Sequence, residues 1–250
     1  MTLERQQIEE AAAYLFHLRV QRQTASSLPH EIRPRSVEDA YAIQDAVHGT
    51  AGWPIEVLKV GCTSELAREI LGIPHPIGGR IPSEGVFASG AEIPASYFSN
   101  PPAIECEFAL QVNAAGDPIA VAPALELVDP RVTSSAGFGG MTTIADNSAG
   151  CGVVLGPPTP IDEAGDLASH AVELRSGSGD VLASGNADAV LGGPPASVEW
   201  TKEHEASRGR EVAGGVWIIT GTCTGLTPTE AGGTYLADFG ALGQVSFSLT

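Results

Sequence analysis

Hydrophobic and polar residues alternate strictly over residues 102–112. Five apolar side chains recur at every second position of this stretch: Ile104, Cys106, Phe108, Leu110 and Val112. An alternation of this length predicts a β-strand with one buried face. The other face carries Glu105 and Glu107, which project side by side about 6.5–7 Å apart because they stand two residues apart on a strand. The strand therefore presents a pair of carboxylates to whatever lies over its polar face.

Apolar residues at helical spacing predict two helices near the N-terminus. The first covers about residues 3–22, and Thr2 is a candidate for its N-cap. The second starts at Ser36, has Asp39 at its third position as in a capping box, and continues to Val47. We expect these helices to form a small cap, residues 1–52, on a larger domain of residues 53–250, with which the cap makes one functional unit.

The remainder of the chain predicts short strands separated by glycine and proline. Residues 55–60 form a strand candidate that ends at Gly61, residues 64–71 a helix closed by Gly72, and residues 75–81 a loop. Further strands are predicted over residues 153–155, 171–174, 181–184, 216–220, 234–239 and 244–249, with one helix over residues 194–208. Short strands with frequent glycine turns favour an α+β fold whose mixed sheet is rolled or barrel-like.

A third carboxylate lies in the apolar run from Ile119 to Val128, whose only charge is Glu126. A buried carboxylate is costly unless it meets a cation or strong donors. Glu105, Glu107 and Glu126 are therefore candidates for one metal site, and oxygen donors alone suit Mg²⁺, Ca²⁺ or Mn²⁺. The same residues also fit a solvated edge strand with one salt-bridged glutamate, and the pattern alone does not separate the two interpretations.

Composition and charge narrow the class of protein. The 250 residues include 13 basic and 30 acidic side chains, a formal net charge of −17, so we expect no nucleic acid and no anionic membrane surface as partner. No apolar run approaches the ~20 residues of a membrane helix. The four cysteines lack C-x-x-C spacing and no signal peptide is recognisable, so we expect a cytoplasmic protein with reduced thiols. The six histidines form no zinc-type pair.

Six motifs follow one another along the chain. They are Lys59-Val-Gly-Cys-Thr-Ser64, Ile104-Glu-Cys-Glu-Phe108, Ala122-Pro-Ala-Leu-Glu-Leu-Val-Asp-Pro-Arg131, Ile144-Ala-Asp-Asn-Ser148, Leu191-Gly-Gly-Pro-Pro195 and Ile219-Thr-Gly-Thr222. In this order they resemble the motifs of the 2-keto-4-pentenoate hydratase group of the fumarylacetoacetate hydrolase superfamily. The resemblance implies that superfamily's fold for the larger domain. It also implies a divalent metal, Mg²⁺ or Mn²⁺, which Glu105, Glu107 and Glu126 hold and which chelates the 2-keto acid end of a substrate.

The resemblance implies roles for further residues. Lys59 would bind the carboxylate of the substrate or transfer a proton, and an acidic protein that binds an anionic acid needs such local positive charge. Substrate contacts are implied for Thr63, Ser64, Asn147, Ser148, Thr220, Gly221 and Thr222. From the residues alone, the segments 147–148 and 220–222 also fit ordinary turn chemistry, and Lys59 also fits an exposed strand position. Because oligomers are usual in the family, we expect a homo-oligomer.

The expected activity is that of a metal-dependent hydratase of a small 2-keto acid or its dienol, such as 2-hydroxypenta-2,4-dienoate. Two features depart from the family pattern. Ile77 stands where the hydratases carry an acidic residue, and the link between Glu107 and Glu126 is shorter than usual. Two alternatives therefore stay open: a C–C bond hydrolase or decarboxylase of an acylpyruvate or oxalocrotonate-like acid, and a non-catalytic member that binds a metal or metabolite.

Overall fold

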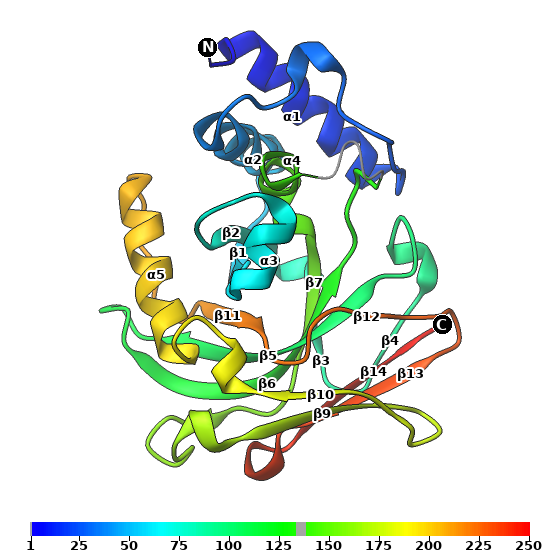
Figure 1. Cartoon of the computed structure of the whole chain (residues 1–250), viewed down its shortest axis with the longest axis vertical. Coiled ribbons are helices and arrows are strands. Elements are labelled where there is room, and N and C mark those ends of the chain that lie inside the picture. Colours follow the sequence, from blue (N-terminus) through cyan, green and yellow to red (C-terminus); the bar gives the residue numbers. More distant parts are fainter. Residues whose placement is uncertain (1, 134–138) are drawn as a thin grey trace.

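The computed structural model describes residues 2–133 and 139–250, and Figure 1 shows that they form three layers. A helical cap lies at one end, a strongly curled sheet in the middle, and a second sheet at the other end. The helices are α1 Arg5–Val20, α2 Val37–Ala51, α3 Glu65–Leu71, α4 Gly140–Ala145 and α5 Pro194–Ser207. The strands are β1 Ile55–Gly61, β2 Ile77–Pro82, β3 Val86–Ala88, β4 Ala91–Ile93, β5 Ala103–Val112, β6 Pro118–Val128, β7 Gly150–Leu155, β8 Thr159–Pro160, β9 Ala171–Ser176, β10 Val181–Asn186, β11 Trp217–Thr222, β12 Thr227–Pro228, β13 Thr234–Asp238 and β14 Gln244–Leu249.

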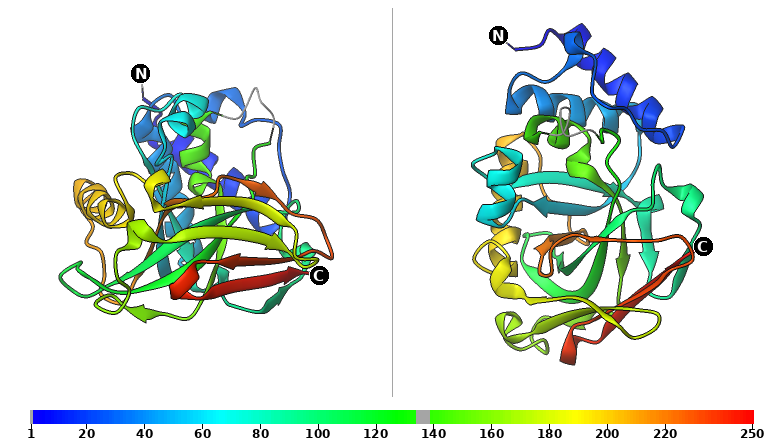
Figure 2. Two further views of the ribbon diagram at one scale, coloured as in Figure 1. Left: turned by 60° about the horizontal axis from the view of Figure 1, so that its bottom comes forward. Right: turned by 45° about the vertical axis from the view of Figure 1, so that its right-hand side comes forward.

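The curled sheet has nine strands in the order β2-β1-β11-β5-β6-β7-β3, with β12 paired to β5 and β8 paired to β6. Most neighbours are antiparallel, but β1 runs parallel to β11, and β3 runs parallel to β7. The curl is tight enough that β2 lies against β7, and the two views of Figure 2 show the half-barrel that results. The predicted α+β fold with a rolled, mixed sheet is confirmed.

The two faces of the curled sheet pack against different partners. The apolar side of β5 forms one large core with the five-stranded sheet β10-β9-β13-β14-β4, where Phe108 meets Phe239 edge to face at 5.2 Å. Cys106 is fully buried there, which confirms the predicted burial of the apolar face of this strand. The inside of the curl is filled by a smaller cluster of apolar side chains: Val57, Ile81, Ala109, Ala122, Ala124, Val153 and Ile219.

The cap is formed by α1 and α2, which share a core with α4 and with Ile77 of β2. The N-cap prediction at Ser36 is confirmed, since its hydroxyl accepts the Asp39 N–H at 3.1 Å. The prediction that Thr2 caps the first helix is wrong. Glu4, two residues further along, is the N-cap, because it and Gln7 form a reciprocal capping box. The division of the chain at residue 52 stays a prediction.

The segment predicted as a loop over residues 75–81 is largely strand β2, and this expectation is corrected. β2 pairs antiparallel with β1 in a register that places Lys59 opposite Gly79. Glycines within the segment suggested a loop, but here they permit the close approach of neighbouring side chains within a sheet. Within the described residues, no helix has the length and apolar character needed to cross a membrane.

Candidate metal centre and active site

Three glutamates converge at one end of the curl's interior. Strands β5 and β6 pair in a register that sets Glu105 directly opposite Glu126, and Glu107 lies on the same face two residues on. One oxygen from each carboxylate lies within 4.8 Å of the others. Glu107 and Glu126 are 1% and 0% exposed. The three glutamates that the sequence pattern singled out are therefore brought together by the fold.

The short link between Glu107 and Glu126 is a direct β-hairpin. Its turn is closed by the N–H of Asn113, which donates to the Asp117 carbonyl at 2.9 Å. Because the two strands connect through this turn alone, antiparallel pairing carries Glu126 back to the level of Glu105. The departure from the usual spacing thus leaves the three carboxylates together.

Burial makes this carboxylate cluster electrostatically costly. Loss of solvent, reinforced by the charge of Glu126, raises the pKa of Glu105 to about 7 although Lys59 opposes the shift. Burial, together with the charges of Glu126 and Glu105, raises the pKa of Glu107 well above its ordinary range, although Lys59 and the Gly221 N–H oppose the shift. The carboxylate of Glu107 accepts one hydrogen bond, from the Gly221 N–H at 2.7 Å. In a site of this kind, carboxylates either hold protons or need a nearby cation.

Among the residues that the structure describes, Lys59 supplies the cation that lies beside these acids. Its Nζ lies 2.6 Å from Glu126 Oε1 and donates to the carbonyl oxygen of Ser148 at 2.9 Å, and the residue is 4% exposed. Burial lowers the pKa of Lys59, but Glu126, Glu105 and Glu107 outweigh that effect and shift it upward overall. The ammonium stays charged, and three carboxylates face a single positive charge.

The donor set fits a hard divalent cation. Among the described residues, Glu126 Oε2 is fully buried and has no hydrogen-bonding partner. A buried, unpartnered carboxylate oxygen beside two further carboxylates is a costly arrangement for the protein alone. Oxygen ligands of this kind match Mg²⁺, Mn²⁺ or Ca²⁺ rather than a softer metal. The candidate ligands are therefore Glu105, Glu107 and Glu126.

Two glycines make room for the stem of Lys59. A Cβ at Gly79 would lie 2.9 Å from Lys59 Cγ, and a Cβ at Gly150 would lie 2.8 Å from Lys59 Cδ and 3.2 Å from Glu126 Oε1. The two distances to the lysine stem are shorter than real Cβ atoms show, so a larger residue at either position would displace the lysine. Strands β2 and β7 therefore carry glycine where they flank the ammonium group.

The predicted substrate-binding residues near β1 and β11 surround the cluster, and most of their polar groups hold the main chain. Ser64 caps α3 by accepting the Ala67 N–H at 3.2 Å. Thr220 donates to the Phe108 carbonyl at 3.0 Å, and Thr222 accepts the Thr224 N–H at 3.3 Å. Gly221 gives its N–H to Glu107, and Thr63 packs so closely that a Cβ at Gly221 would lie 2.5 Å from its Oγ1. Contact of these residues with a substrate stays a prediction.

Asn147 and Ser148 lie on the other side of Lys59. The Asn147 amide bonds both main-chain groups of Arg80, and the Ser148 hydroxyl donates to the Gly78 carbonyl at 2.7 Å. The Ser148 carbonyl accepts from Lys59. The predicted turn chemistry is thus present, while the predicted contact with substrate stays untested.

Ile77 contributes an apolar side chain to the same site. The β1–β2 register pairs Gly61 with Ile77 and Lys59 with Gly79, so Ile77 faces the same side of the sheet as Lys59. A Cβ at Gly61 would lie 3.3 Å from Ile77 Cγ1 and 3.7 Å from Lys59 Nζ. A buried isoleucine, whose side chain can neither donate nor accept a proton, therefore stands beside the ammonium group.

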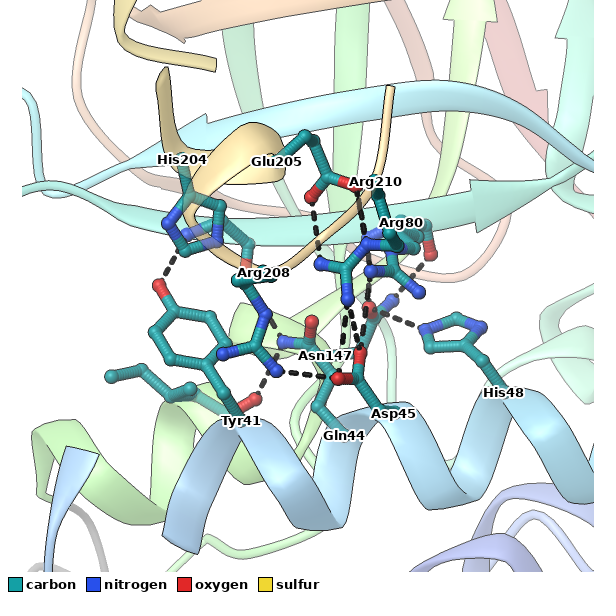
Figure 3. Close-up of polar contacts among 12 residues, drawn as sticks. Tyr41, Gln44, Asp45, His48, Arg80, Asn147, His204, Glu205, Arg208 and Arg210 are labelled. Carbon is teal, nitrogen blue, oxygen red and sulfur yellow. Dashed lines mark hydrogen bonds and ion pairs between the residues drawn. The ribbon is translucent and has the colours of Figure 1, made fainter. Parts of the chain in front are cut away.

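Sequence reasoning missed a cluster of charged and polar groups behind β2. Figure 3 shows Asp45 of α2, Arg80 of β2 and Glu205 of α5 joined by ion pairs with Arg208 and Arg210. His48 and Asn147 lie at its edge, where His48 Nε2 is 3.0 Å from Asn147 Oδ1. These residues come from distant parts of the chain, so no local spacing could have revealed them.

Comparison with known proteins agrees with this geometry, although no family model matches the chain. The sequence is 30% identical over 209 residues to a 2-hydroxypent-2,4-dienoate hydratase of Pseudomonas putida, covering 77% of the chain and 93% of the relative. It is 27% identical over 259 residues to a 2-keto-4-pentenoate hydratase of Paraburkholderia phymatum, covering 97% of each. A 4-oxalocrotonate decarboxylase of P. putida is 27% identical over 260 residues, covering 98% of the chain and 97% of the relative.

Solved structures give the same result. A 4-oxalocrotonate decarboxylase from P. putida G7, complexed with magnesium and adipate, superimposes with a TM-score of 0.92 at 25% identity over 100% of both chains. A fumarylpyruvate hydrolase from Pseudomonas aeruginosa, in complex with Mn²⁺ and pyruvate, shares the fold with a TM-score of 0.57 at 18% identity, covering 79% of this chain and 90% of that one. Fold and site together define a protein of the fumarylacetoacetate hydrolase superfamily. Within it, the chain belongs to the 2-keto-4-pentenoate hydratase family.

Proposed function

We propose that this protein is a metal-dependent hydratase of a small 2-hydroxy dienoate or 2-keto acid, such as 2-hydroxypenta-2,4-dienoate. The observation that carries the proposal is the convergence of Glu105, which is half-buried, with the buried residues Glu107, Glu126 and Lys59. Mg²⁺ or Mn²⁺ held by the three glutamates would supply Lewis-acid stabilisation of negative charge on a 2-oxo acid. The names of the relatives support the same class of substrate.

The chain's own groups have distinct tasks in this proposal. An ammonium group has three N–H donors. Two of those on Lys59 are directed to Glu126 and the Ser148 carbonyl, which leaves one to bind the carboxylate of the substrate or to pass a proton. The small apolar cluster that includes Ala109, Ala122 and Ala124 lies on the same inner face of the curl as the glutamates and is fully buried. The site thus combines a charged end with an apolar interior.

Decarboxylation of an oxalocrotonate-like acid is a second candidate, and Ile77 favours it. Addition of water needs a group that moves a proton to or from water, whereas loss of CO₂ needs chiefly stabilisation of the developing enolate. Ile77 provides no such group beside Lys59. The close structural likeness to a 4-oxalocrotonate decarboxylase agrees with this second candidate.

One experiment separates the candidates. Purified protein with Mg²⁺ or Mn²⁺ is given 2-hydroxypenta-2,4-dienoate or 4-oxalocrotonate, and the ultraviolet absorbance, the organic product and CO₂ release are followed. The proposal predicts conversion of the first substrate to 4-hydroxy-2-oxopentanoate, abolished by EDTA. CO₂ release from the second substrate alone would replace hydration by decarboxylation. No turnover of either, with Mn²⁺ still bound, would leave acylpyruvate cleavage or a non-catalytic role.

Glu107→Gln tests the metal site apart from turnover. Gln keeps an oxygen for the Gly221 N–H but removes a buried charge, so we expect Mn²⁺ affinity to fall by about tenfold or more, or roughly 1.4 kcal/mol. The metal-free variant should unfold at the same temperature as wild type or higher, because repulsion among the carboxylates is relieved. Glu92→Gln, an exposed strand glutamate, is the control and should change neither quantity. Unchanged Mn²⁺ affinity in Glu107→Gln would remove this residue from the ligand set.

Assembly and location complete the proposal. We infer a cytoplasmic homo-oligomer, as the family resemblance implies. The four free cysteines are consistent with a reducing compartment, and Leu66 and Ile70 are 66% and 70% exposed on α3, where a second copy could cover them. Light scattering of the purified protein tests the assembly, and a monomer at all accessible concentrations would contradict it.

A further inference from the structure

Three consecutive residues beside the proposed active site have left-handed backbone conformations, although none of them is glycine. Their φ angles are 56° at Asn147, 52° at Ser148 and 61° at Ala149. L-residues avoid this region, and a run of three persists only where the surrounding structure imposes it. The short turn between α4 and β7 is therefore held in place by specific contacts.

The side chain of Asn147 supplies those contacts. Its Oδ1 accepts the Arg80 N–H at 2.8 Å, and its Nδ2 donates to the Arg80 carbonyl at 2.8 Å and to the Gly150 carbonyl at 3.0 Å. Because Oδ1 can only accept, His48 must carry its proton on Nε2 to bond it at 3.0 Å. The amide of one buried residue thus joins the turn to β2 and to the cap helix α2 (Figure 3).

β2 is itself fixed from behind by the charged cluster in Figure 3. Arg80 Nη2 lies 3.2 Å from Asp45 Oδ1 and 3.5 Å from Glu205 Oε2. Arg210 bonds both of these acids, which lie on α2 and α5. Strand β2, to which Asn147 is hydrogen-bonded, is therefore linked by ion pairs to helices α2 and α5 and supports the turn.

The turn directs one carbonyl group at Lys59. The Ser148 oxygen accepts from Lys59 Nζ at 2.9 Å, while the Ser148 hydroxyl donates to Gly78 of β2 at 2.7 Å. Together with Glu126, this carbonyl fixes the ammonium from two sides. A turn relaxed to ordinary backbone angles would point the Ser148 carbonyl elsewhere.

We infer that Asn147 is a positioning residue for Lys59: by locking the left-handed turn, its amide aims the Ser148 carbonyl at the ammonium and so fixes where Lys59 meets the substrate. This inference rests on the proposed function for its effect on turnover. It gives Asn147 a task different from the substrate contact that sequence resemblance implied.

Asn147→Gly is the variant of choice, because glycine adopts the left-handed angle freely and only the amide contacts are lost. We expect kcat to fall by about tenfold or more, with KM and Mn²⁺ affinity changed by no more than about twofold. Asn113→Gly is the matched control. Asn113 also closes a turn, by accepting the N–H groups of Ala115 and Asp117, but it lies in the β5–β6 hairpin away from the site, so its kcat should not change.

A double-mutant cycle separates positioning from a general structural role. In a Lys59→Met background, Asn147→Gly should lower the residual kcat by no more than about twofold, because a residue that acts through Lys59 loses its effect once Lys59 is gone. Multiplicative losses in the double variant would overturn the inference. So would a loss of Mn²⁺ affinity in Asn147→Gly equal to its loss of kcat.

A crystal structure of Asn147→Gly provides a readout that needs no turnover. We expect the Lys59–Ser148 hydrogen bond to be broken, with the remainder of the fold retained. If the wild-type protein proves inactive, the proposed function fails while this structural comparison still decides the inference. An unchanged Lys59 position in the variant would overturn it even in a fully active enzyme.

Discussion

Lys59 and Lys202 are the only lysines in the sequence, and they occupy opposite environments. Lys59 is 4% exposed and faces the buried carboxylates of Glu107 and Glu126 and the half-buried Glu105, whereas Lys202 is 32% exposed and pairs with Glu199 along helix α5. Exposed ion pairs contribute little to stability, while removal of one partner from a buried pair leaves a charge without compensation. The two residues therefore form an internal comparison of buried and exposed charge.

Lys59→Met should destabilise the metal-free protein by roughly 3 kcal/mol at pH 8, where its carboxylate neighbours are most fully charged. Turnover should fall by about a hundredfold or more, because the only ammonium at the site is lost. Denaturant unfolding and steady-state kinetics measure the two effects. Lys202→Met is the control, with a change in unfolding free energy below about 1 kcal/mol. Equal stabilities of the two variants would mean that the Lys59–Glu126 pair contributes no more than a surface pair.

The residues of the site differ in how far sequence could predict them. Alternation placed Glu105 and Glu107 on one face, and a lone charge in an apolar run marked Glu126. Lys59 drew attention through family resemblance, since its own neighbours Leu58 and Val60 fit any exposed strand position. The contacts of His48 and Arg80 could not be predicted, because their partners lie in segments far away in sequence.

Strand β2 is the element whose sequence misled most. Its glycines weaken strand character locally, yet Gly79 is needed because a Cβ there would lie 2.7 Å from the Asn147 carbonyl oxygen and 2.9 Å from Lys59 Cγ. Helices α2 and α5 and the strands of the C-terminal third were predicted from short-range periodicity alone. β2 was predicted as a loop because its strand conformation depends on tertiary contacts rather than on local sequence preference.

Gly79→Ala should lower the unfolding free energy by about 1–3 kcal/mol and reduce turnover, since the added methyl must push away main chain and the lysine stem together. Thermal unfolding and kinetics provide the measurement. Gly49→Ala is the matched control on α2, where a Cβ meets no atom within 4 Å. There we expect a gain of about 0.5–1 kcal/mol from helix propensity. If Gly79→Ala leaves the unfolding free energy and turnover unchanged, β2 can shift to accommodate a methyl group more easily than its contacts indicate.

Folding stability should fall at acidic pH because His48, at the junction between cap and sheet, is buried in its neutral form. Burial lowers its pKa to about 4, so between this value and the ordinary 6.5 the unfolded chain binds more protons than the folded one. Stability contributed by neutral His48 is thus lost as pH falls through this window. Relative to wild type, His48→Gln should gain about 1–2 kcal/mol between pH 7 and pH 5. Denaturant unfolding of both proteins at the two pH values tests this, and an equal change of stability in wild type and variant would contradict it.

At the candidate metal site, three carboxylates face one ammonium group, so the folded protein holds an excess of negative charge there. A cation that binds only the folded state stabilises it by mass action. At about 100 times its dissociation constant, Mg²⁺ or Mn²⁺ should add about 2.7 kcal/mol, which is roughly 5–10 °C in melting temperature for a chain of this size. Calorimetry with and without EDTA measures the shift. An identical melting temperature in both conditions would count against the metal site.

The overall arrangement was predictable only as a class. Frequent glycine turns indicated a rolled sheet, but nothing local specified that β1 lies parallel to β11, with Val57 beside Trp217. That pairing inserts β11 between β1 and β5, and it decides how Lys59 approaches the glutamates. Pairing between segments so distant in sequence depends on the tertiary packing of the whole domain, and short-range sequence patterns carry no information about it.

This strand order also has a consequence for biosynthesis. The β5–β6 hairpin, with all three glutamates, leaves the ribosome well before β11, yet β11 separates β1 from β5 in the finished sheet and gives Glu107 its N–H partner from Gly221. A nascent chain that lacks β11 holds its acids without their lysine in place. The complete site, with Lys59 beside Glu126 and the Gly221 N–H bonded to Glu107, therefore forms only after β11 has been synthesised.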